Sequence, residues 1–127
     1  MDFSNYLANK LISATVRNLP YSTPATVWVS LYTSDPTKDN KGDEVEQASY
    51  TRREVTFNEP ENGFTSNANQ VDWSEATTNW GVVTHIGICD ALVDGNLLYF
   101  TEIDNPKDIL TGDQFRIKEY ELKLQLT

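Results

Sequence analysis

Residues 80–100 constrain the possible folds of this chain more than any other segment does. They read as two β-strands rich in branched and aromatic side chains, reversed near Asp94-Gly95. Asp-Gly is a strong hairpin signal, because both central residues of a tight hairpin turn need φ > 0. Apolar side chains fall on both faces of each strand, which indicates a central hairpin covered on both sides. The predicted core residues are Val83, Ile86, Ile88, Leu97, Tyr99 and Phe100.

Residues 4–17 are predicted to form the one substantial helix. Ser4 is a good N-cap, Leu7 and Leu11 recur at helical spacing, and Pro20 lies just beyond the end. A helix with an apolar stripe must pack against something. It either covers one face or end of the sheet or docks on a neighbouring subunit, and we expect the first. The predicted stripe consists of Phe3, Tyr6, Leu7, Leu11, Ile12 and Val16.

From Ala25 onward the apolar residues recur with a period of two, as they do in a β-strand. Val27, Val29 and Leu31 face one way, and the residues between them face the other. Further along, the pattern predicts strands over residues 50–57 and 70–73, loops over 37–49 and 58–69, one helical turn over 74–79 and an irregular segment over 103–110.

The last predicted strand, residues 114–126, changes phase within its length. Phe115 and Ile117 are odd-numbered, whereas Leu122 and Leu124 are even-numbered. One extra residue near Lys118-Glu119 resets the alternation, which is the effect of a β-bulge or of a strand that crosses between two sheets.

Six or more short strands, frequent turn signals and long polar loops predict an all-β fold. We expect an antiparallel β-sandwich, jelly-roll-like or a flattened barrel, preceded by one N-terminal α-helix. The length of 127 residues suits one hydrophobic core. The prediction is therefore a single domain over residues 1–127, with the helix in 1–19 and the sandwich in 20–127.

Composition excludes several classes of protein. A formal net charge of −9 argues against nucleic acid as a partner, because phosphates require a basic surface. No run of about 18 apolar residues occurs, so we expect no membrane partner, and the N-terminus lacks a secretion signal. Three Trp, six Tyr and five Phe exclude a disordered chain. Cys89, the lone cysteine, is expected to be a small buried hydrophobe and not a reactive thiol.

The titratable residues predict no enzyme. His85 is the only histidine and lies in mid-strand, so we expect a structural side chain bonded to a backbone carbonyl or a carboxylate. The carboxylate pairs that could hydrolyse a glycan, Glu59 with Glu61 and Asp104 with Asp108, lie in predicted loops and not on rigid elements. We predict no catalytic residues and no cofactor.

The residues that could bind a metal ion or a sugar also have simpler structural interpretations. Asp35, Asp39 and Asp43 are four residues apart in an acidic loop, which is not the spacing of a calcium-binding loop, so no metal ligands are predicted. Four aromatic residues could form a sugar-stacking platform if exposed, although strand aromatics are more often core or interface residues. They are Trp28, Tyr32, Trp73 and Trp80.

Several short motifs along the chain resemble one family. The most distinctive is Trp-Gly-x-Val-Thr-His-x-x-Ile-x-Asp-Ala over residues 80–91, followed by Gly-Asn-Leu-Leu-Tyr over residues 95–99. The others open the helix at residues 4–11 and cover the strands at 21–36 and 50–57. In this order and spacing, the motifs resemble a small family of tailed-bacteriophage virion proteins known as tail-fibre proteins. The resemblance runs from the N-terminus to about residue 110.

This resemblance implies a non-enzymatic structural protein of a tailed-phage virion, assembled in the host cytoplasm. Its expected partners are other virion proteins and further copies of itself, with a trimer favoured. The resemblance leaves the position in the virion open between a tail fibre and a collar or capsid decoration. A receptor- or glycan-binding module at a fibre tip is the alternative from another functional class.

Overall fold

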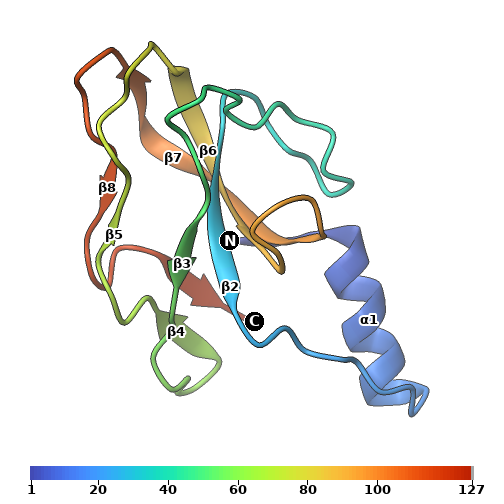
Figure 1. Ribbon diagram of the computed structural model, residues 1–127. Coiled ribbons are helices and arrows are strands. Elements are labelled where there is room, and N and C mark those ends of the chain that lie inside the picture. The colour runs from blue at the N-terminus through green and yellow to red at the C-terminus, as the bar shows by residue number, and fades with distance from the viewer. Residues whose placement is uncertain (127) are drawn as a thin grey trace.

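The computed structural model describes residues 1–126, which form one short helix and nine strands (Figure 1). Every strand pairing in this part of the chain is antiparallel. The elements are β1 (Asp2–Phe3), α1 (Asn5–Val16), β2 (Val27–Tyr32), β3 (Arg53–Val55), β4 (Phe64–Ser66), β5 (Val71–Asp72), β6 (Gly81–Cys89), β7 (Leu97–Ile109), β8 (Arg116–Ile117) and β9 (Lys123–Gln125).

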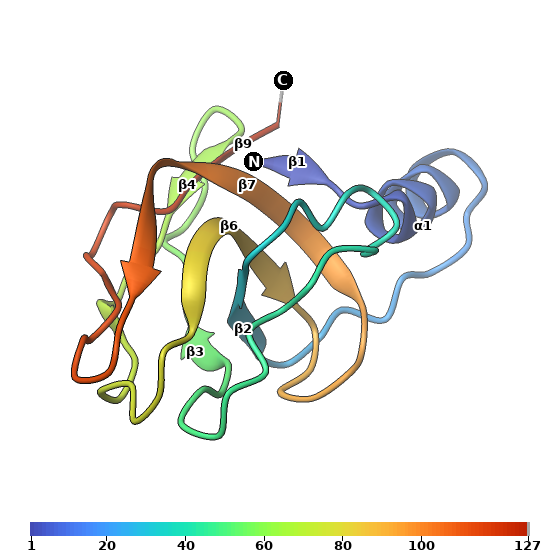
Figure 2. The ribbon, with the colours of Figure 1, turned by 90° about the horizontal axis from the view of Figure 1, so that it is seen from above.

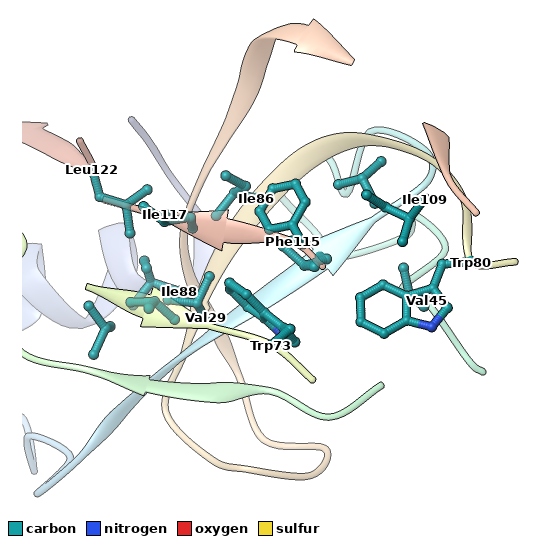
Figure 3. Packing of buried hydrophobic residues seen from close by; sticks show 14 of the residues in the cluster. Val29, Val45, Trp73, Trp80, Ile86, Ile88, Ile109, Phe115, Ile117 and Leu122 are labelled. Carbon is teal, nitrogen blue, oxygen red and sulfur yellow. The ribbon is translucent and has the colours of Figure 1, made fainter. Parts of the chain in front are cut away.

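The strands form two layers around one main core. Five of them make the larger sheet in the order β1-β7-β6-β2-β3, and the pairs β4-β9 and β5-β8 lie across from it (Figure 1). Trp73 and Phe115 from the second layer meet edge to face at 5.4 Å between ring centroids, and they pack beside Val29 and Ile88 of the large sheet (Figure 3). The fold is thus an all-β sandwich with one N-terminal helix, as predicted, and its sheets do not close into a barrel.

The central hairpin is formed by β6 and β7. Asp94 and Gly95 have φ of 55° and 69°, which confirms the predicted reversal. All six predicted core residues pack in a core, although Tyr99 is only partly buried. Strand β6 is central, between β2 and β7. Strand β1 pairs with β7 at Tyr99 and Phe100, so neither strand of the predicted segment 80–100 lies at the edge of the sheet, whereas β7 beyond Phe100 has a free outer edge.

The irregularity predicted in residues 103–110 is confirmed around Asn105-Pro106 as a bulge, although β7 continues through it to Ile109. Between the pairs Val83↔Lys107 and His85↔Glu102, β6 advances two residues while β7 advances five. This bulge absorbs Pro106, which could not donate a hydrogen bond to a regular ladder. The proline therefore bends the strand and does not end it.

Three other sequence predictions are corrected around the second layer. Strand β3 is shorter than the predicted strand 50–57, and the predicted loop 58–69 contains β4. Residues 74–79 form no helical turn, because the backbone N–H groups of Trp73 and Ala76 donate to the carbonyls of Phe115 and Asp113 at 3.1 and 2.8 Å. These bonds between distant segments replace the local bonds that a helical turn requires.

The C-terminal segment crosses between the two small sheets. Strand β8 pairs with β5 and β9 pairs with β4, and the turn between them places Tyr120 at φ 67°. Asn67, which is fully buried, holds this turn: its Nδ2 donates to Lys118 O at 2.9 Å, and its Oδ1 accepts from Leu122 N at 2.8 Å. The predicted phase change is therefore the crossing of a strand between sheets.

Candidate interaction surface

The N-terminal helix is attached to the sandwich at its first turn. Ser4 caps it as predicted, because its Oγ accepts from Leu7 N at 3.1 Å. Ser4 N donates to Leu98 O at 2.9 Å, and Asn5 N donates to Lys38 O at 2.8 Å. Leu7 is the one fully buried side chain of α1. The helix thus meets one end of the sheet through its first turn and lies beside the sandwich (Figures 1 and 2).

The outer half of α1 exposes apolar side chains. Ile12 is 58% exposed, Val16 is 76% exposed and Leu19, just beyond the helix, is 46% exposed. Five residues separate Leu7 from Ile12, so at about 100° per residue the two side chains lie roughly 140° apart on the helix. The single predicted stripe is therefore divided: one side faces the body and the other faces solvent. We call Ile12, Val16 and Leu19 the helix strip.

The N-terminal segment has a charge opposite to that of the whole chain. Residues 3–34 contain Lys10 and Arg17 and no acidic residue, although the chain has 19 Asp and Glu. The acidic residues therefore gather elsewhere on the surface.

A groove of about 740 Å³ runs between the free edge of β7 and the C-terminal segment. Its apolar lining includes Ile86, Ile103, Ile109, Phe115 and Leu122. The basic residues that line it are Lys107, Arg116 and Lys123, beside the amino-terminal Met1. Its acidic residues are Glu102, Asp104, Asp108, Asp113 and Glu121. We call this the β7 groove.

An ion pair that the sequence patterns did not reveal ties four segments together. Arg52, 8% exposed, binds Glu44 with two hydrogen bonds of 2.9 and 2.8 Å. Its Nη1 donates to the carbonyls of Ala91 and Asp94 in the β6–β7 turn, each at 2.8 Å. Tyr50 donates its hydroxyl proton to Glu44. The Tyr50 hydroxyl oxygen in turn accepts a hydrogen bond from the backbone N–H of Leu31 in β2. The predicted strand pattern contained Tyr50 and Arg52, but nothing in it linked them to Glu44.

The ionisation of this group follows its surroundings. Burial acts to lower the pKa of the Arg52 guanidinium, but its hydrogen bonds to Glu44, together with the electrostatic effects of Cys89, Glu44 and Tyr32, outweigh burial and raise that pKa. Burial, together with the nearby Glu44 carboxylate, raises the pKa of the Tyr50 phenol. Both effects keep Arg52 charged and Tyr50 neutral, as their hydrogen bonds require.

His85 lies on the outer face of β6, directly across from Tyr32. Its Nδ1 is 2.8 Å from Thr84 Oγ1, and its Nε2 is 3.9 Å from carboxylate oxygens of both Asp35 and Glu102. The predicted hydrogen bond to a backbone carbonyl or a carboxylate is replaced by the neighbouring hydroxyl.

The acidic residues considered as sites are separated or have structural partners. Asp35 accepts from Thr37 N at 2.9 Å, and Asp39 accepts from Asn5 Nδ2 at 2.9 Å. Asp104 and Asp108 line the β7 groove, whereas Glu59 and Glu61 are exposed elsewhere. Within residues 1–126 no group of three His, Cys, Asp or Glu side chains is arranged to hold a metal ion.

The four aromatic residues do not form a platform. Tyr32, Trp73 and Trp80 are almost completely buried, whereas Trp28 is partly exposed. Trp80 donates to Ser49 Oγ at 3.0 Å, as expected for a buried indole. Trp28 alone borders a shallow depression, together with Arg53, Glu54, Gln70, Asp72 and Leu92.

Cys89 is buried beside Tyr32, with its sulfur 3.3 Å from Ser30 Oγ. Burial raises the pKa of its thiol, which favours the neutral and unreactive form. This position agrees with the predicted small buried hydrophobe.

The fold is a small β-sandwich with one N-terminal helix, and the helix strip exposes apolar side chains of the kind found at protein interaction sites. No helix in the described chain has the length and apolar character needed to cross a membrane. The sequence model of a family described as Podophage GP4 fiber I protein gp80 matches residues 2–125. The chain belongs to this family of podophage fibre proteins, as the resemblance implied. No curated protein matches the chain.

Proposed function

We propose that this protein is a non-enzymatic structural subunit of a podophage fibre, which assembles with further copies of itself and with other virion proteins. The observation that carries the proposal is the family match over residues 2–125. Assembly would take place in the host cytoplasm, and a trimer is the favoured state because fibres are generally symmetric oligomers.

Two structural features support assembly as the function. Trp73, Trp80 and Tyr32 strengthen the interior and are not available to a ligand. The helix strip instead exposes three apolar side chains on the solvent side of the N-terminal segment. Exposed apolar surface of this kind is typical of an interaction site.

The position in the virion can be tested by electron microscopy of phage particles that carry an epitope tag on this chain. We expect antibody label on the fibres. Label on the head shell or at the neck would favour the capsid decoration or collar alternative, and particles without label would contradict the virion role. The mass of the purified chain in solution then tests the trimer, and a persistent monomer would remove it.

If the glycan-binding alternative is correct, the depression beside Trp28 is the place where a saccharide would bind. An indole flanked by Arg53, Glu54 and Asp72 offers one stacking face and several hydrogen-bonding groups, which are the groups that saccharides need. If this chain is a receptor-binding module, Trp28→Ala will abolish adsorption to host polysaccharide while the protein stays folded. Under the structural role, that variant will have no measurable effect on adsorption.

A further inference from the structure

We propose that the helix strip of one copy docks in the β7 groove of the next copy. The two surfaces are different, so the contact is head to tail, and repetition of it around a ring joins the subunits. This inference rests on the proposed function as an assembling subunit, and it names the two surfaces that meet.

The apolar parts of the two surfaces fit one mode of recognition. Ile12 and Val16 lie one helical turn apart on the same side of α1, and Leu19 continues the series beyond the helix end. Side chains at this spacing are the anchors by which a helix occupies an apolar groove. The β7 groove supplies the complement, because Ile103 and Phe115 lie in its lining over the main core.

The charges favour the same pairing. Lys10 and Arg17 are the only charged residues of the segment 3–34, which makes the helix basic as a whole. The β7 groove has five carboxylates against three basic side chains and the amino terminus of Met1, and Arg116 already binds Asp72 outside the groove at 2.7 Å. Direct pairing of two α1 helices would bring two basic helices together. A basic helix is therefore attracted more strongly to this groove than to a second copy of α1.

The arrangement of the fold excludes a contact within one molecule. Figures 1 and 2 both place α1 at one end of the large sheet and the β7–β8 end of the sandwich at the other. A surface that meets a different surface on the next copy forms a heterologous interface, which yields a closed ring when the rotation closes.

The free edge of β7 is poorly suited to pairing with an additional strand from another copy. Pro106 removes a backbone donor, and the bulge with Glu102 and Lys107 interrupts a flat edge. Prolines, bulges and charges of this kind protect an exposed strand from pairing with another chain. Side chains of a docked helix do not depend on these backbone groups.

Charge reversal with rescue tests the pairing. One variant carries Lys10→Glu and Arg17→Glu, a second carries Asp104→Lys and Asp108→Lys, and a third carries all four changes. Light scattering measures the mass of each full-length protein over a range of concentrations, and circular dichroism checks the fold. We expect each double variant to associate at least tenfold more weakly than the original chain, and the fourfold variant to recover most of the association.

Matched controls separate this contact from general effects. Glu59→Lys with Glu61→Lys adds the same charge outside both surfaces and should leave the mass unchanged. Ile12→Ser should dissociate the oligomer, whereas Val82→Ser, at another exposed apolar position, should not.

The outcomes distinguish this inference from the proposed function. Failure of rescue, or an oligomer insensitive to the groove changes, would overturn the helix–groove contact while leaving a fibre subunit in place. Loss of association on helix reversal alone would indicate pairing between helices. A strictly monomeric original chain would also refute the contact, and the labelling of particles would then decide the virion role by itself.

Discussion

At the scale of single residues, a few side chains have positions that no periodicity could indicate. Gly87 is one: a Cβ there would lie 2.7 Å from both Leu97 Cδ1 and Ser30 Oγ, so the outer face of the large sheet has no room for a side chain. Asn67 is another, since its amide replaces backbone partners on both sides of the C-terminal turn. Sequence periodicity predicts which face a residue takes, but not which atoms fill the space above it.

The core assignment of Ile86 is tested by truncation. Ile86 is 5% exposed within the main cluster, so Ile86→Ala should lower the free energy of unfolding by about 2–5 kcal/mol through lost burial and a residual cavity. Val82→Ala, at an exposed position on the same strand, should cost well under half of that. Urea denaturation of both variants provides the comparison, and equal midpoints would contradict the assignment.

At the scale of elements, the β6–β7 turn depends on a residue far from it in sequence. Arg52 reaches the carbonyls of Ala91 and Asp94, while Glu44 and Tyr50 hold its guanidinium in place. Asp94-Gly95 accounts for the reversal of the chain. The loop between Cys89 and Leu97 has seven residues, however, and is therefore longer than a two-residue hairpin turn. Hydrogen bonds between Asp90 and Asn96 join the two ends of this loop, and the ion pair adds a contact from a distant part of the chain.

Removal of the Glu44 charge should show how much the β6–β7 loop depends on the Arg52–Glu44 ion pair. Glu44→Gln leaves Arg52 buried without its counter-charge, and we expect a loss of about 2–3 kcal/mol, below the range for a fully buried pair because Glu44 is 24% exposed. Hydrogen exchange of the backbone amides in residues 90–96 should also accelerate. Glu46→Gln is the matched control on an exposed neighbour, and the same loss in that variant would argue against a specific role for Glu44.

At the scale of the whole molecule, buried phenols predict how stability depends on pH. Burial raises the pKa of both Tyr32 and Tyr50 above the value of about 10 that an unfolded chain would have. Below about pH 10 both states bind these protons equally, so stability is unaffected. Above it the unfolded chain releases protons that the folded chain keeps, and stability falls as pH rises.

Urea denaturation at a series of alkaline pH values, with tyrosinate absorbance followed in parallel, measures this effect. The ionisation of the two buried phenols should coincide with unfolding. In Tyr50→Phe the decline with pH should be shallower, although the starting stability is lower because Glu44 loses a hydrogen bond. A native protein that titrates all its tyrosines near pH 10 would contradict the burial of these phenols.

The sequence by itself determined the local preferences of this protein. Ser4 as a cap, the alternation of Val27, Val29 and Leu31, and the positive φ at Asp94-Gly95 all depend on neighbours within a few residues. For that reason the helix, β2 and the central hairpin were predicted closely. The family motifs along the chain likewise pointed to a phage fibre protein before any contact between segments was known.

Only the tertiary structure decided which distant groups meet. Residues 74–79 looked helical, but hydrogen bonds to residues 113–115 hold them against the opposite strand. The stripe of α1 looked continuous, but the sheet end reaches only the Leu7 side and leaves Ile12 and Val16 to solvent. Arg52 finds Glu44, and β7 keeps a free edge beside a groove, because the three-dimensional fold places them so. Local sequence encodes backbone preference, whereas burial and pairing depend on the whole chain closing around one core.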